Sequence, residues 1–149
     1  MKTLRVLACV LALAGSATPA LSADLVFRKD QGPMILETFD GRPYWEMQAF
    51  CAGVHGASAN WFSRRGDLTR SKTHEKDALG AFQDAVGQLR RDRGISEAAA
   101  TRLVEPVVQM GGRRTAEALR VSGLDVKGQW NYWRSFCADA KVAYVRMAR

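Results

Sequence analysis

After Pro43, apolar side chains recur at the three- and four-residue steps that are typical of an amphipathic helix. Pro43 suits the first position of a helix, because its missing N–H would have no partner there anyway. The pattern predicts a helix from Pro43 to about Gly66. Its apolar stripe consists of Tyr44, Met47, Cys51, Val54, Ser58 and Trp61, and Phe50 and Phe62 widen it.

Residues 72–93 predict a second helix, and Gly94 follows it as a stop signal. The apolar face of this helix consists of Ala78, Leu79, Phe82, Ala85, Val86 and Leu89. A third helix is predicted to begin after Ser96, because serine readily caps a helix N-terminus. Its stripe consists of Ala99, Leu103, Val107 and Met110.

Two features are expected to disturb the third helix. Pro106 should kink it, because the proline ring removes a hydrogen-bond donor and clashes with the preceding turn. Gly111 and Gly112 should interrupt it, so that residues 114–121 form a short further helix that ends at Gly123.

The last predicted helix has the clearest pattern, with Asp125 as its expected cap. Its apolar residues alternate at steps of four and three, the spacing of packed helices. They are Val126, Trp130, Trp133, Cys137, Ala140, Tyr144 and Met147. Four amphipathic helices with short links predict an all-α fold, a compact bundle over residues 43–149.

Residues 1–23 have the order of a secretory signal peptide. Lys2 and Arg5 precede an apolar core at 6–14 that is too short to span a bilayer, and small residues follow. Cleavage is expected after Ser22 or Ala23. The pattern predicts an exported protein, periplasmic or secreted, with no transmembrane segment in the mature chain.

The mature chain is expected to begin with an irregular arm at 24–42 and to carry a moderately basic surface. The whole chain has 22 basic and 15 acidic residues, a net charge of +7, and loss of the signal peptide removes two basic residues. Such a surface is compatible with an envelope protein or an anionic envelope polymer as partner. Nucleic acid is not expected as a partner of an exported protein.

Cys51 and Cys137 are expected to form a disulfide, because Cys9 leaves with the signal peptide and an exported compartment oxidises thiols. Each cysteine lies in the apolar stripe of its helix, so the first and last helices should be antiparallel neighbours. This register predicts further neighbours: Tyr44 near Tyr144, Val54 near Trp133 or Arg134, and His55 beside Trp133.

Met47, Cys51 and His55 support an alternative interpretation, a copper carrier of the periplasm. The three side chains lie along one helix face, and thioether, thiolate and imidazole ligands suit Cu(I). A disulfide at Cys51 would exclude this site, because the thiolate would be gone. The C-x-x-C-H motif of covalently bound haem is absent, and no cofactor is predicted.

Two rows of small residues on the first helix indicate a close approach by another group. The rows are Ala49, Gly53 and Ala57, and Ala52, Gly56 and Asn60. A glycine inside a helix costs up to about 1 kcal/mol relative to alanine, so the two glycines need a reason. The preferred explanation is packing against Trp130 and Trp133, and the alternative is a flat ligand in the groove.

A partner surface is predicted from Trp45, Trp130, Tyr132 and Arg134, which combine aromatic and basic side chains. The arginine pairs at 64–65, 90–91 and 113–114 would form an anion-binding surface if they met at one end of the bundle. No catalytic motif occurs, and an enzyme with a site near Glu105 remains a third hypothesis. The preferred hypothesis is an exported, disulfide-stabilised binding or envelope-associated protein.

Overall fold

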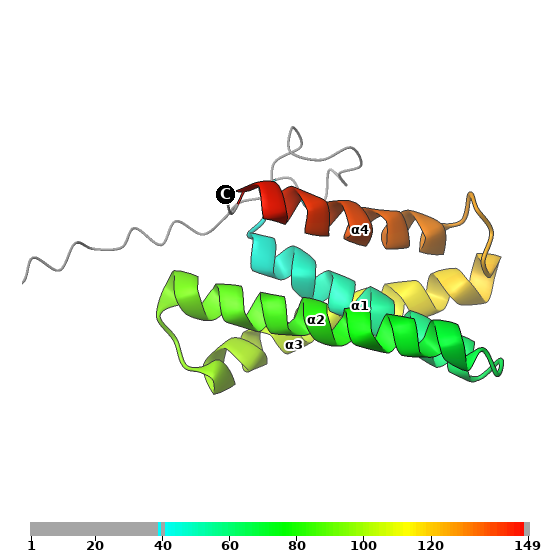
Figure 1. Ribbon diagram of the computed structural model, residues 1–149, viewed down its shortest axis with the longest axis horizontal. Coiled ribbons are helices and arrows are strands. Elements are labelled where there is room, and N and C mark those ends of the chain that lie inside the picture. The colour runs from blue at the N-terminus through cyan, green and yellow to red at the C-terminus, as the bar shows by residue number, and fades with distance from the viewer. Residues whose placement is uncertain (1–38, 40, 148–149) are drawn as a thin grey trace, which may run out of the picture.

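The computed structural model describes residue 39 and residues 41–147, with side chains up to residue 142. It contains four helices: α1 (Tyr44–Ser63), α2 (Leu68–Arg93), α3 (Glu97–Ser122) and α4 (Gln129–Met147). Each helix runs antiparallel to the one before it, and short links join them (Figure 1). The predicted all-α bundle is therefore confirmed. The predicted signal peptide, its cleavage site and nearly all of the arm at 24–42 lie outside the described residues.

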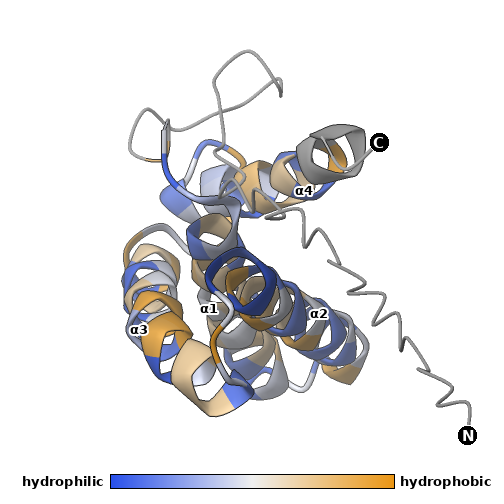
Figure 2. Ribbon diagram, turned by 90° about the vertical axis from the view of Figure 1, so that its left-hand side faces the viewer, coloured by the Kyte–Doolittle hydropathy of each residue, from blue (hydrophilic) through white to orange (hydrophobic). Residues whose placement is uncertain are grey.

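The helix α1 contacts all three other helices and lies among them when the bundle is viewed from its end (Figure 2). One apolar cluster joins α1 to α4 and to Phe39, whose ring packs on Phe50 and Phe136. A second cluster joins the first half of α1 to α2 and α3, and a third surrounds Phe62 at the other end. This central position explains why α1 is apolar around most of its circumference.

The helix α2 begins four residues earlier than the sequence pattern indicated. Asp67 is its N-cap, and its carboxylate accepts a hydrogen bond from the Arg70 backbone N–H. Gly94 ends the helix in the left-handed conformation, as predicted. Leu79, which the pattern placed on the buried face, is exposed.

The helix α3 is continuous, so the predicted interruption and the separate short helix are wrong. It runs through Pro106 and through Gly111 and Gly112 to Ser122. The glycines serve helix packing, because α3 crosses α1 at this point. A Cβ atom on Gly111 would lie 2.2 Å from the Phe50 carbonyl oxygen, and one on Gly53 would lie 2.0 Å from the Val108 carbonyl oxygen. The expected Trp130 and Trp133 are not the neighbours of Gly53.

The predicted disulfide between the first and last helices is present. The sulfur atoms of Cys51 and Cys137 lie 2.15 Å apart, and the Cα atoms 5.5 Å apart. Seven residues after Cys51 and seven before Cys137, the Trp130 indole N–H donates to the Ser58 hydroxyl at 2.9 Å. These two links confirm the antiparallel register of α1 and α4. The start of α4 was predicted too early, since Val126 precedes the helix and is 80% exposed.

The structure tests two of the predicted neighbour pairs between the first and last helices. Val54 and Trp133 belong to the same apolar cluster, as expected. His55 instead lies against His74 of α2, with ring centroids 5.3 Å apart. The Tyr144 side chain lies outside the described part. None of the helices in that part is long and apolar enough to cross a membrane.

Candidate functional site

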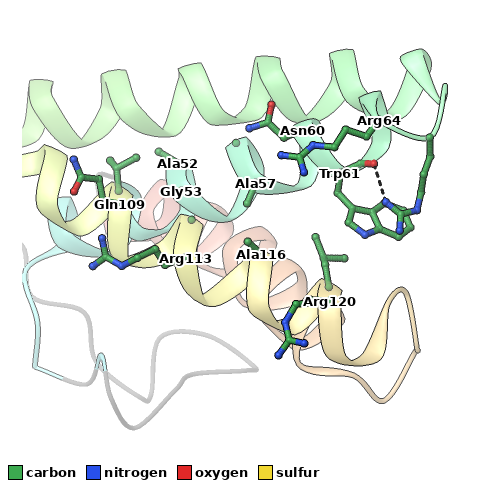
Figure 3. A pocket seen from close by; sticks show the side chains of 15 residues that line it. Ala52, Gly53, Ala57, Asn60, Trp61, Arg64, Gln109, Arg113, Ala116 and Arg120 are labelled. Atoms are coloured by element: carbon green, nitrogen blue, oxygen red, sulfur yellow. Dashed lines mark hydrogen bonds between the residues drawn. The ribbon is translucent and has the colours of Figure 1, made fainter.

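A groove of about 800 Å³ lies between α1 and α3. Figure 3 shows small side chains from both helices, Ala57 and Ala116, in the middle of the groove. Long side chains stand at its edges, with Arg64 on the α1 side and Arg113 and Arg120 on the α3 side (Figure 3). The groove thus combines a floor of small residues with basic edges.

The floor stays open because small residues continue past the point where the helices touch. Gly53 is in backbone contact with α3, whereas a Cβ atom on Gly56 would have no atom within 4 Å. Ala57 and Asn60 continue the open strip toward the end of α1. The two glycines of α1 therefore have different roles: Gly53 allows the crossing and Gly56 faces the groove.

The arginines of the groove differ in how they are held. Arg65 lies over the Trp61 ring, with its guanidinium carbon 3.5 Å from the ring centroid. Arg120 donates to the Glu117 carboxylate at 2.9 Å. The side chains of Arg64 and Arg113 have no hydrogen bond or ion pair with any other residue in the described part. These two guanidinium groups are available to an anion in the groove.

The arginine pairs of the sequence only partly come together. Arg64, Arg65 and Arg113 line the groove, and Arg120 joins them although it belongs to no pair. Arg90 does not line the groove and instead forms an ion pair with Glu97 at 2.9 Å. The basic surface therefore has a different composition from the predicted one.

Only part of the predicted partner surface is exposed, because two of its four residues are buried. Trp45 is 8% exposed and packs between α1, α2 and α3, and Trp130 is 7% exposed in the cluster around Phe62. Only Tyr132 and Arg134 are exposed. The tryptophans were placed outside because their large rings fit either a core or a binding surface, and here both fill the core. A partner contact by Tyr132 and Arg134 remains a prediction.

The alternative copper site of Met47, Cys51 and His55 does not form. Cys51 is bonded to Cys137 and provides no thiolate, and Met47 is fully buried in the apolar cluster. Glu105, the residue of the enzyme hypothesis, is exposed on α3 and lines neither the groove nor the second cavity. An enzymatic site near Glu105 stays a prediction.

A second cavity of about 520 Å³ lies between α1, α2 and α4, and it contains the only two histidines of the chain. The Nδ1 atoms of His55 and His74 lie 3.0 Å apart, at hydrogen-bonding distance. His74 is only 9% exposed, and its ring stacks on the Phe62 ring with centroids 5.4 Å apart. The earlier start of α2 at Leu68 places it inside the helix.

Burial lowers the pKa of both histidines, which favours their neutral forms. Desolvation, helped by the positive charge that His74 would carry, lowers the pKa of His55 from 6.5 to about 4, and Arg134 and Lys141 act in the same direction. Desolvation is also the main cause that lowers the pKa of His74. Asp77 opposes both shifts but does not cancel them.

The stability of the metal-free protein should therefore fall as the pH drops from about 6.5 to about 4. In that window the unfolded state binds a proton at residue 55 and the folded state does not, which disfavours folding by about 2–3 kcal/mol at pH 4.5. Urea unfolding at pH 7 and pH 4.5, in a chelating buffer, measures the loss. The variant His55→Gln should lose less over the same interval, and parallel losses in both proteins would contradict the expectation.

Comparison of the chain with protein-family models, with curated proteins and with solved structures found no match. The two rows of small residues on the first helix indicated the α1 wall of this groove, but the sequence could not place the α3 wall beside it, because the two walls lie more than 40 residues apart in the chain. Gly56 belongs to these rows, and a Cβ atom there would meet no atom of the neighbouring described helices within 4 Å.

Proposed function

We propose that this protein is an exported binding protein whose groove between α1 and α3 holds an anionic amphiphile. The apolar part of the ligand would lie on the small residues of the floor, and its anionic head would meet the guanidinium groups of Arg64 and Arg113. The observation that carries the proposal is the open strip of small residues with free arginines at its edges.

The size and composition of the groove support this class of ligand. Ligand pockets of proteins are mostly apolar, contain a few polar groups in fixed positions and have volumes of about 300–1,000 Å³. The groove lies in that range. Its length along two helices suits an elongated molecule, and planar guanidinium groups recognise phosphate and carboxylate oxygens in pairs.

Export is part of the proposal and rests on the sequence of residues 1–23 and on the disulfide. Structural disulfides are typical of oxidising compartments. Anionic amphiphiles, such as lipids with a phosphate head, are abundant at the envelope surfaces that an exported protein meets. The basic mature chain would be attracted to such surfaces before any specific contact forms.

Titration calorimetry with two single-chain lipids tests the proposal. Lysophosphatidylglycerol and lysophosphatidylcholine of equal chain length, both below their micelle concentrations, differ in net head charge. We expect the anionic lipid to bind and the zwitterionic one to bind at least about tenfold more weakly, since one charged contact contributes about 1.5–3 kcal/mol. The variant Arg113→Gln should lose a similar factor for the anionic lipid only.

A filled groove provides the matched control. Gly56→Leu places a side chain in open space and replaces a helical glycine, so the variant should fold at least as stably as the native protein. It should nevertheless fail to bind either lipid. Equal binding of both lipids, or undiminished binding to the Gly56→Leu variant, would exclude the groove as the site.

A further inference from the structure

We propose that His55, His74 and Asp77 form a binding site for a divalent transition-metal ion, with Zn²⁺ as the best-suited ion. The three residues come from α1 and α2 and line the second cavity, whereas the groove lies between α1 and α3. This site goes beyond the proposed lipid-binding function and does not depend on it.

The distances between the three side chains fit one ion. One ligand atom from each residue lies within 4.8 Å of the other two. Zinc binds imidazole nitrogen at about 2.0–2.1 Å in tetrahedral geometry, which separates two ligand nitrogens by about 3.3 Å. The two Nδ1 atoms are 3.0 Å apart, so a small outward movement of the rings makes room for the ion.

The protonation state of the histidines also fits a metal. Imidazole binds metal only in its neutral form, and burial lowers the pKa of both rings, which is the direction that favours this form. In the metal-free pair, one Nδ1 carries a proton and donates it to the other Nδ1. Metal binding requires that ring to hold its proton on Nε2 instead, so both Nδ1 lone pairs face the ion and no proton is released.

The His74 ring is held in position by its surroundings. It is stacked parallel to the Phe62 ring, and the Trp130 ring is steeply inclined to it, with ring centroids 6.5 Å apart. Trp130 is fixed in turn by its hydrogen bond to Ser58. A ligand that is already oriented loses little conformational freedom when the metal binds, which favours affinity.

The charges of the cavity both favour and oppose a cation. Asp77 supplies a carboxylate ligand, and Asp84 adds a second negative charge to the lining. Lys76, Arg134 and Lys141 line the same cavity and oppose a positive ion. Neutralising one of these cations should therefore strengthen metal binding, an effect opposite to that of removing a ligand.

Zinc titration of the full mature chain, freed of metal by a chelator, tests the site by calorimetry and by thermal unfolding. We expect one ion per chain and a rise in Tm with zinc concentration. His74→Gln and Asp77→Asn should each weaken binding by at least about tenfold. Asp84→Asn, a carboxylate of the same cavity outside the cluster, should keep affinity close to native, and Lys141→Gln should raise it.

A spectroscopic measurement on the unaltered protein avoids dependence on variants that fail to fold. Cu²⁺ prefers the same nitrogen and oxygen ligands, and its electron paramagnetic resonance spectrum reports how many nitrogens bind it. Two coordinated imidazole nitrogens are expected. No saturable zinc binding, or a copper spectrum without two equivalent nitrogens, would show that the histidine pair is only a structural hydrogen bond.

Discussion

Replacing Gly53 by alanine should destabilise the protein by about 3 kcal/mol or more, although alanine is the better helix former. The added Cβ atom would lie 2.0 Å from the Val108 carbonyl oxygen and 2.6 Å from the Gly112 nitrogen. Both are backbone atoms of α3, which cannot rotate away as a side chain can. The two helices would have to separate along their crossing, and the apolar cluster around Val104 and Leu89 would lose packing.

The matched control is Gly56→Ala, one turn along the same helix. A methyl group there meets no atom within 4 Å, so this variant should gain up to about 1 kcal/mol from helix propensity. Urea unfolding of the three proteins, followed by circular dichroism, gives the comparison. Equal stability of the two variants would mean that α1 and α3 do not cross in contact at Gly53.

Removing the disulfide with the double variant Cys51→Ala, Cys137→Ala should lower the free energy of unfolding by about 2–5 kcal/mol. The bridge joins residues 86 positions apart, and the chain-entropy model assigns about 4–5 kcal/mol to a loop of that length. Small domains have only about 5–15 kcal/mol of net stability, so the loss is a large share. The remaining α1–α4 contacts would include the Phe50 and Trp133 rings and the hydrogen bond from Trp130 to Ser58.

Two measurements check this result. Alkylation of the denatured native protein should label no cysteine until reductant is added, and the intact mass also reports whether and where the predicted signal peptide is cleaved. Guanidinium unfolding of the double variant gives the energetic effect. Labelling of two cysteines without reductant would show that the disulfide is absent. An unchanged unfolding midpoint in the variant would show that it does not stabilise the protein.

The sequence predicted the parts of the fold that depend on periodicity and on pairs of like residues. The stripe from Tyr44 to Trp61 and the glycine at position 94 located α1 and the end of α2. Because the prediction assigned Cys9 to a signal peptide, it left two cysteines with only one partner each, and the bridge followed from counting. The bridge then fixed the register of α4 on α1, which the bond from Trp130 to Ser58 confirms.

The continuous helix α3 could not be predicted, because its glycines have two opposite uses. Adjacent glycines commonly end a helix, but they also allow two helix backbones to touch, and only the position of α1 decides between the two. Pro106 is similar: packing of Val104, Val107 and Val108 on the core holds the helix through a residue that disfavours it.

The two sites depend on contacts across helices, and the sequence does not encode these locally. His55 and His74 are separated by 19 residues and carry no ligand motif, so nothing in the chain pairs them. The sequence also could not decide whether Trp45 and Trp130 are buried or exposed, since a large ring adjacent to arginines is compatible with a core or with a surface. Burial, which decides such cases, is a property of the assembled bundle.

The contrast between the two glycines of α1 has a consequence for evolution. At Gly53, sterics alone forbid other residues, so natural selection would retain glycine there in any protein with this helix crossing. At Gly56 the fold leaves room for a Cβ atom, and mutation would replace a costly helical glycine unless a bound molecule penalised the change. Among descendants of a common ancestor, glycine at position 53 would therefore indicate that the helix crossing is retained. Glycine at position 56 would indicate that the groove still binds a ligand.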